Sequence, residues 1–136
     1  MGYPTKSLIL QRFITSRQLL PGDWANGISD ALFSAQTIVP AGAATQVAAL
    51  PVNAAQVELL AGTASAIKLP VSFPGAEVTI LNNSGNAQQI FGTGNDVVQT
   101  TGTTYAAAAT GVVLASLACA IYRCVKTGFW QRITTA

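Results

Sequence analysis

The residue types that most often carry catalysis are scarce in this chain. Its 136 residues include no histidine, which excludes histidine-based nucleophilic catalysis and most transition-metal sites. The carboxylates are isolated along the sequence, at Asp23, Asp30, Glu58, Glu77 and Asp96. Folding could still pair two of them, as in a glycosidase, but no local spacing indicates it. We therefore predict no catalytic residues, no cofactor and no metal, and a protein that is not an enzyme.

One glycine-rich segment, Gly92 to Asp96, superficially resembles a ligand-binding loop. It lacks the Gly-Lys-Ser/Thr ending of a phosphate-binding loop. A calcium loop needs several acids, and this segment has one. A turn between two strands explains the same residues, so we predict a turn without a ligand.

The two cysteines, Cys119 and Cys124, are five residues apart. In a strand they would face opposite sides and could not form a disulfide with each other. No Cys-x-x-Cys pair or other metal-ligand spacing occurs. We predict free thiols that pack as small apolar groups.

Five aromatic residues could stack on a sugar if they were exposed: Tyr3, Trp24, Tyr105, Tyr122 and Trp130. Scattered aromatics in a β-protein more often anchor the core. A core role is therefore preferred, and a sugar-binding module remains an alternative.

The composition favours assembly over an independent existence. Only 9% of the residues are charged, against about 25% in ordinary globular domains. Thr, Ser, Asn, Gln and Gly must then form much of the surface, and neutral polar groups lose less on burial than ions do. Few charges also leave little to keep copies apart. We expect self-association as a dimer or trimer.

Nucleic acid and membrane are not expected as partners. The net charge is +2, and the basic residues form no run or stripe of the kind that nucleic-acid binding requires. No signal peptide is evident. The most membrane-like stretch, residues 106–122, is alanine-rich and interrupted by Thr110, Gly111 and Ser116, so two strands and a turn are preferred there.

The chain divides near residue 30. Residues 1–30 form an N-terminal arm or edge segment with three basic residues ahead of its first acid and aliphatic residues of no clean period. A solvated segment is one interpretation, and an arm lying on an acidic partner is the other. Exposed apolar residues here would need a partner. The candidate contacts to a capsid or another subunit are Lys6, Arg12, Phe13, Arg17 and Trp24.

Residues 31–136 are predicted to form one β-sandwich domain. Short strand candidates alternate with turn residues, and no internal repeat of fixed period is evident. They are 32–39, 45–50, 56–60, 66–69, 77–81, 88–91, 96–99, 111–114, 119–125 and 129–133. Such spacing favours an all-β, antiparallel, jelly-roll-like sandwich.

Two further details of the sandwich are predicted. Residues 82–86 are rich in Asn and Gly and predict a hairpin loop, and residues 119–125 predict a central strand covered on both faces. The predicted core comprises Val78, Ile80, Ile90, Val113, Ile121, Tyr122 and Phe129.

Residues 51–133 resemble a module common in structural proteins of tailed bacteriophages. The resemblance depends on several short sequence motifs that occur in the same order along the chain: Ala66 to Pro70, Pro74 to Asn83, Gln89 to Gly92, Asp96 to Val98, Cys119 to Cys124 and Gly128 to Trp130. The resemblance covers more than half of the chain and implies a β-sandwich used for assembly on capsids or tail fibres. Residues 1–50 fall outside it.

For a free-standing chain of this length, the resemblance implies a capsid cement, or decoration, protein. Its partner would be the major capsid protein, and its location the outer capsid surface of the virion after synthesis in the host cytoplasm. A receptor-binding or tail-fibre β-domain is the alternative.

Overall fold

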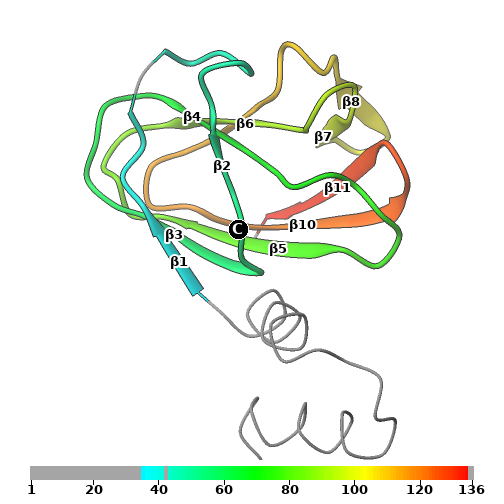
Figure 1. Ribbon diagram of the computed structural model, residues 1–136, viewed down its shortest axis with the longest axis horizontal. Helices are drawn as coiled ribbons and strands as arrows, with labels where there is room; N and C mark the ends of the chain where they lie inside the picture. The colour runs from blue at the N-terminus through cyan, green and yellow to red at the C-terminus, as the bar shows by residue number, and fades with distance from the viewer. Residues whose placement is uncertain (1–34, 42, 135–136) are drawn as a thin grey trace, which may run out of the picture.

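The computed structural model describes residues 35–41 and 43–134, all of whose regular elements are β-strands. The strands are β1 (Ala35–Ile38), β2 (Leu50–Pro51), β3 (Gln56–Leu59), β4 (Ala66–Lys68), β5 (Glu77–Asn82), β6 (Gln88–Phe91), β7 (Val97–Thr101), β8 (Thr104–Ala106), β9 (Val112–Leu114), β10 (Cys119–Lys126) and β11 (Phe129–Thr134). They form a seven-stranded sheet, β1-β3-β5-β10-β11-β7-β8, and a four-stranded sheet, β2-β4-β6-β9. Figure 1 shows β1, β3, β5 and β10 along the lower layer, with β4 and β6 above.

The first six strands wind as a coil between the two sheets. β1, β3 and β5 pair in parallel in one sheet, and β2, β4 and β6 pair in parallel in the other. Ala35 pairs with Gln56, and Gln56 with Thr79, so these residues occupy equivalent places in successive circuits. On the opposite side, Leu50 pairs with Ile67, and Ile67 with Ile90.

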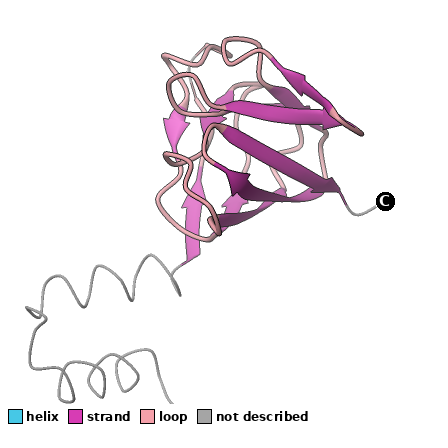
Figure 2. Ribbon diagram, turned by 90° about the vertical axis from the view of Figure 1, so that its right-hand side faces the viewer, coloured by secondary structure: helices cyan, strands magenta, loops and turns pink. Residues whose placement is uncertain are grey.

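The rest of the chain closes the sandwich. The antiparallel hairpin of β10 and β11 inserts between β5 and β7, so β10 becomes a central strand. β9 adds to β6 as the antiparallel edge of the small sheet. The two layers are seen edge-on in Figure 2.

The core lies between the sheets because strand side chains alternate between faces. Ala120, Tyr122 and Cys124 of β10 point inward and are buried, as are Val78 and Ile80 of β5. The small sheet contributes Ile67, Ile90, Val112 and Leu114. A second cluster, Ala49, Ala66 and Phe91, packs under the segment that precedes β2.

The predicted all-β, two-layer architecture is confirmed in its coarse form. The expectation of antiparallel sheets is wrong for the coil, whose four strand pairs are all parallel. The β7–β11 pair is parallel as well, so five of the nine strand pairs in the described residues are parallel. A jelly roll pairs its strands in antiparallel fashion, so that arrangement is not confirmed.

The hairpin predicted around residues 82–86 is also wrong. β5 and β6, which flank the turn, belong to different sheets and do not pair. The turn is an arch between layers, held by the buried side chain of Asn82. By contrast, the C-terminal hairpin is confirmed, with Gly128 at a φ of 87° in its turn.

Four of the seven predicted core residues are buried: Val78, Ile80, Ile90 and Tyr122. Val113 is 52% exposed, and Ile121 and Phe129 are half-buried. These three point to the outer faces, because alternation cannot place Ile121 and its neighbour Tyr122 on the same side. The predicted cover over both faces of β10 is therefore not found in the described residues.

One predicted strand is largely absent, and the alanine run lies in a strand end and a turn, in line with the strands and turn preferred for residues 106–122. Within residues 45–50 only Leu50 is in a strand, because residues 43–49 fold as turns over the small sheet. The alanine run at 106–109 ends β8 and continues as a turn, so its helical propensity is overridden by strand pairing on either side.

Candidate docking surface

The turns gather at two opposite ends of the sandwich. The Asn82 end comprises residues 60–65 and 83–87, where the coil passes from the large sheet to the small one, and residues 115–118, which lead from β9 of the small sheet to β10 of the large one. The Asp96 end comprises residues 52–55, 69–76 and 92–96, where the chain returns from the small sheet to the large one, and the β10–β11 hairpin turn at residues 127–128. The two ends use their polar side chains for different purposes.

At the Asn82 end, buried amides hold the turns together from inside. Asn82 Nδ2 donates to the carbonyls of Asn86 at 2.8 Å and Ala115 at 2.9 Å, with Leu114 at 3.1 Å. Asn82 Oδ1 accepts from Ser84 Oγ at 2.7 Å. These bonds satisfy polar groups that would otherwise be costly to bury.

Gln88 extends the same network to the preceding circuit. Its Nε2 donates to Ser84 Oγ at 2.9 Å and to the carbonyl of Thr63 at 3.1 Å, while its Oε1 accepts from the amide of Ser65. The network therefore joins the turns of two successive circuits. Hydrogen bonds between buried polar groups hold this end of the sandwich together.

At the Asp96 end, polar groups brace the 69–76 loop. The amide of Ser72 donates to Asp96 Oδ2 at 3.0 Å, and Ser72 Oγ accepts from the amide of Gly128 at 2.7 Å. The amide of Gly75 donates to the carbonyl of Cys124 at 2.8 Å. The loop is thus tied to both the 92–96 turn and the C-terminal hairpin.

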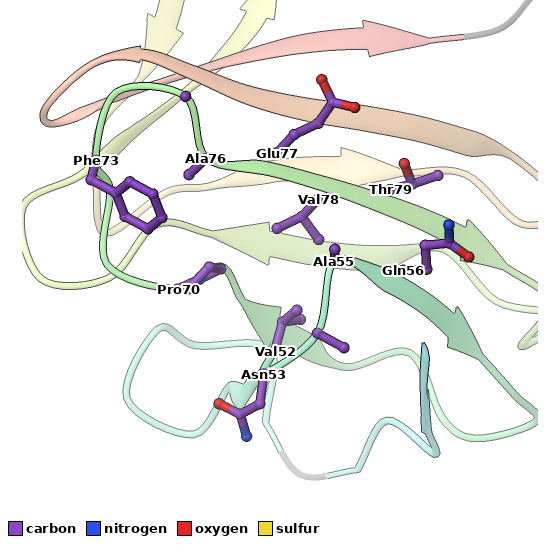
Figure 3. Close-up of a pocket in the computed structure, with 12 residues that line it drawn as sticks. Val52, Asn53, Ala55, Gln56, Pro70, Phe73, Ala76, Glu77, Val78 and Thr79 are labelled. Atoms are coloured by element: carbon purple, nitrogen blue, oxygen red, sulfur yellow. The ribbon is translucent and has the colours of Figure 1, made fainter. Parts of the chain in front are cut away.

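The braced loop presents apolar side chains to solvent. Val71 and Phe73 are 67% and 61% exposed, whereas Ser72 between them is buried. Phe73 borders a hollow of about 470 Å³ whose lining also includes Val52, Ala54 and Val78. Figure 3 shows the Phe73 ring beside this hollow, with Pro70 and Val52 below it. An aromatic held over an apolar hollow is typical of an interface anchor.

The electrostatics of the described surface are sparse. Seven charged residues occur in residues 35–41 and 43–134: Glu58, Lys68, Glu77, Asp96, Arg123, Lys126 and Arg132. Glu77 and Arg123 form an exposed ion pair at 2.8 Å across β5 and β10. Lys126 lies over the Phe129 ring, 4.9 Å from its centroid. Most of the surface can therefore be desolvated without stripping water from ions.

The Gly92–Asp96 segment forms the turn that was predicted. A side chain at Gly92 would lie 2.3 Å from the carbonyl oxygen of Asp96, and Gly94 has a φ of 62°. Gln46 Nε2 donates to the carbonyls of Gly92 and Gly94, both at 2.8 Å. The Asp96 carboxylate is engaged by Ser72, so these glycines serve the packing of the turn.

Neither cysteine forms a disulfide, as predicted, and the two occupy opposite faces of β10. Cys124 is buried and its Sγ donates to the carbonyl of Lys126 at 3.2 Å. Burial raises the pKa of the Cys124 thiol above its ordinary value. A thiol kept protonated is a poor nucleophile, so Cys124 acts as a packing residue.

Trp130 and Tyr122 are fully buried, which confirms the core role preferred for them. Tyr105 and Phe129 pack edge-to-face with ring centroids 5.3 Å apart. Among the described aromatics, Phe73 is the one exposed outright. A platform of several fully exposed aromatic side chains is therefore not seen among the described residues.

The candidate contacts Lys6, Arg12, Phe13, Arg17 and Trp24 lie outside the described residues. Sequence reasoning did not identify Val71 and Phe73. Their signal was present in the phrase Pro70-Val71-Ser72-Phe73-Pro74, because two prolines predict a loop and apolar residues in a loop need a partner.

Two kinds of feature are absent from the described residues, a membrane-spanning helix and a cluster of metal ligands. No helix among them is long and apolar enough to cross a membrane. No group of three or more Cys, Asp or Glu side chains in the described part of the chain is placed to hold a metal ion.

Comparison with known proteins identifies no relative: no family model, no curated protein and no solved structure matches the chain. The resemblance to phage structural proteins therefore depends on the short sequence motifs between residues 66 and 130 that suggested it.

Proposed function

We propose that this chain is a non-enzymatic structural protein of a tailed bacteriophage that binds the outside of the capsid shell. The observation that supports the proposal best is the Asp96 end, where Val71 and Phe73 are exposed on a braced loop over an apolar hollow. A rigid loop loses little conformational freedom on binding, so more of the contact free energy is retained. The sparsely charged surface suits close contact with a coat subunit.

The mechanism would be the bridging of neighbouring coat subunits, which strain apart as the packed genome presses on the shell. A ligand that binds only the intact arrangement stabilises it by mass action. Many copies on one shell act together, as dimers or trimers if the protein self-associates. The bound protein would be part of the virion surface.

A receptor-binding or tail-fibre β-domain is the second candidate. The coil favours it, because stacked parallel circuits are a repeat architecture that can extend into a fibre. The repeat is short here: three parallel strands in each sheet among the described residues. The short sequence motifs that resemble phage structural proteins are compatible with a place on the capsid and with a place on a tail fibre.

Particle labelling separates the two candidates. The protein carrying a small gold label is incubated with particles that lack it and imaged by negative stain. Label distributed over the head supports the capsid role, and label at the tail tip supports the fibre role. Label at neither place contradicts both.

The docking surface is tested with two full-length variants. Phe73→Ser should weaken binding to the particles by about 10- to 100-fold, the effect of losing a central apolar anchor. Val113→Ser is the matched control, because Val113 is 52% exposed on an edge strand of the small sheet. Equal loss in both variants would show that Phe73 is not an anchor.

A further inference from the structure

The outer face of the seven-stranded sheet has an apolar centre. Outward side chains of Thr79, Ile121 and Ile133 are neighbours across β5, β10 and β11. Leu81 lies beside them on β5 and is 38% exposed, and Ile133 is 44% exposed. The small sheet covers the opposite, inner face, so this apolar centre is only partly covered by the described residues.

A hollow of about 290 Å³ opens on the same face, over β1, β3 and β5. Outward residues that line it are Ala35, Thr37, Gln56, Glu58, Thr79 and Leu81. The described chain begins at Ala35, immediately after the segment 1–34. The hollow therefore adjoins the point at which the preceding chain enters the sandwich.

Residues 6–17 have the composition that this face would accept. They contain five large apolar residues, Leu8, Ile9, Leu10, Phe13 and Ile14. They also contain Lys6, Arg12 and Arg17 and no acid. An apolar segment with basic residues needs an apolar surface that carries acid.

The face carries carboxylates at its margins. Glu58 lines the hollow, and its Oε1 accepts a hydrogen bond from Asn83 Nδ2 at 2.7 Å. It forms no ion pair with a described basic residue. Glu77 lies on the same face and is paired with Arg123. Glu58 is therefore the carboxylate that can receive a basic residue of the segment.

The chain is long enough for this contact to form within one molecule. The stretch from Arg17 to Ala35 spans up to about 60 Å when extended. The sheet from β1 to β11 is four strand spacings wide, or about 20 Å. Covalent attachment supplies an effective concentration in the millimolar range, which favours the chain's own segment over a neighbour's.

We propose that residues 6–17 dock on the outer face of the seven-stranded sheet of the same chain, over Leu81, Ile121 and Ile133. The proposal goes beyond the capsid role and does not depend on it. It replaces the coat subunit by the protein's own sheet as the partner of Lys6, Arg12, Phe13 and Arg17. The exposed loop at the Asp96 end remains available for the capsid.

Hydrogen exchange followed by mass spectrometry tests the contact in the full-length protein. Backbone amides of residues 6–17 should exchange at least tenfold more slowly than those of a synthetic peptide of residues 1–20. Leu81→Asp should remove that protection, because it places a charge at the apolar centre. Val113→Asp, at an exposed position of the small sheet, should leave the protection unchanged.

Phe13→Asp tests the same contact by changing the segment instead of the sheet. It keeps the proposal testable if the Leu81→Asp protein does not fold. It should restore fast exchange in residues 6–17 while the strands stay protected. Exchange at the peptide's rate in the wild type would overturn the proposal. So would protection that survives both Phe13→Asp and Leu81→Asp.

Light scattering after size exclusion, repeated at tenfold dilution, identifies whose segment is bound. Protection that is independent of concentration, whatever the oligomeric state, is the expected result. Protection that fades together with a dimer on dilution would assign the segment to a neighbouring copy and overturn docking within one chain.

Discussion

At the Asn82 end the amide side chains point into the protein, whereas at the Asp96 end polar groups hold a loop whose apolar residues point out. Asn82 and Gln88 are fully buried and bond to carbonyls of three different turns. Ser72 is also buried, but it is flanked by exposed Val71 and Phe73. Both ends are held by hydrogen bonds to buried side chains, and they differ in what they leave on the surface.

This difference means that the polar groups at the Asn82 end mainly stabilise the fold, whereas those at the Asp96 end mainly support binding. A polar network that faces inward contributes to the free energy of folding and leaves little for a partner to recognise. A polar brace beneath exposed apolar residues preorganises a contact surface and adds less to stability. Substitutions at the Asn82 end should therefore change stability most, and those at the Asp96 end should also change binding.

The largest expected effect is that of Asn82→Ala. It removes the hydrogen bonds that the buried amide makes to the carbonyls of Leu114 and Ala115 and to the hydroxyl of Ser84. The Ala115 carbonyl and the Ser84 hydroxyl keep their bonds to the Ala118 amide and the Asn86 carbonyl. Since each lost hydrogen bond contributes about 0.5–1.5 kcal/mol, the free energy of unfolding should fall by about 3 kcal/mol. Urea denaturation followed by tryptophan fluorescence measures it.

Asn83→Ala is the matched control for that experiment. Asn83 is the adjacent residue, its side chain is exposed, and Nδ2 bonds to Glu58 at the surface. Its loss should change stability by about 0.5 kcal/mol or less, the usual surface value. Equal effects of the two substitutions would show that the inward network does not carry the stability of this end.

Ser72→Ala should have an intermediate effect on stability and a clear effect on binding. It removes the acceptor of the Gly128 amide, at a cost of about 1–2 kcal/mol. The loosened loop should then present Phe73 less rigidly, so particle binding should weaken although no exposed side chain has changed. Unchanged binding in a folded Ser72→Ala protein would argue against preorganisation at the Asp96 end.

The sequence predicted the positions of most strands because turn residues mark where the chain reverses. It did not predict which sheet each strand joins. Asn82 to Asn86 has the composition of a hairpin loop, and the same residues make an arch between layers. Short strands alternate in the same way in parallel and antiparallel sheets, so the coil was not evident. Its circuits also differ in length, since the step from Leu50 to Ile67 is shorter than the step from Ile67 to Ile90, and no fixed period marks them.

The candidate site was predictable only in general terms. The low charge indicated a surface suited to assembly, and the Pro-flanked Val71 and Phe73 lay in an evident loop. Their exposure depends on Ser72, Asp96 and Gly128, which are far apart in the sequence and meet only through the fold. The buried amides of Asn82 and Gln88 had no sequence signal either, since both types are usually exposed.

Leu117→Asn should produce a small gain in stability at the Asn82 end. Leu117 has a φ of 60°, and it is 76% exposed. This left-handed conformation costs about 1 kcal/mol for a residue such as leucine and less for asparagine, so the midpoint of urea denaturation should rise accordingly. Particle binding should stay at the wild-type value. Weakened binding would place a docking contact at the Asn82 end and break the contrast between the two ends.

Tyr122→Phe should have the smallest effect at neutral pH, in the centre of β10 between the two ends. The Tyr122 hydroxyl is buried and has no hydrogen-bond partner among the described residues. Removing it should change the free energy of unfolding by less than about 1 kcal/mol, towards greater stability, because an unpaired buried hydroxyl is unfavourable. A larger loss at pH 7 would show that the hydroxyl has a partner outside the described residues.

The free energies of unfolding of the wild type and the Tyr122→Phe protein should diverge at alkaline pH. Burial raises the pKa of Tyr122 far above its ordinary value, an effect that Arg132 partly offsets. Above about pH 10 the unfolded chain loses the phenol proton while the folded chain keeps it, so the wild type loses stability as pH rises, by at most about 1.4 kcal/mol per pH unit. The phenylalanine variant lacks this loss, and the remaining tyrosines are common to both proteins. Urea denaturation at pH 7 and pH 11 should therefore show the variant's advantage growing with pH, and a constant difference would mean that Tyr122 titrates in the folded protein as it does in the unfolded chain.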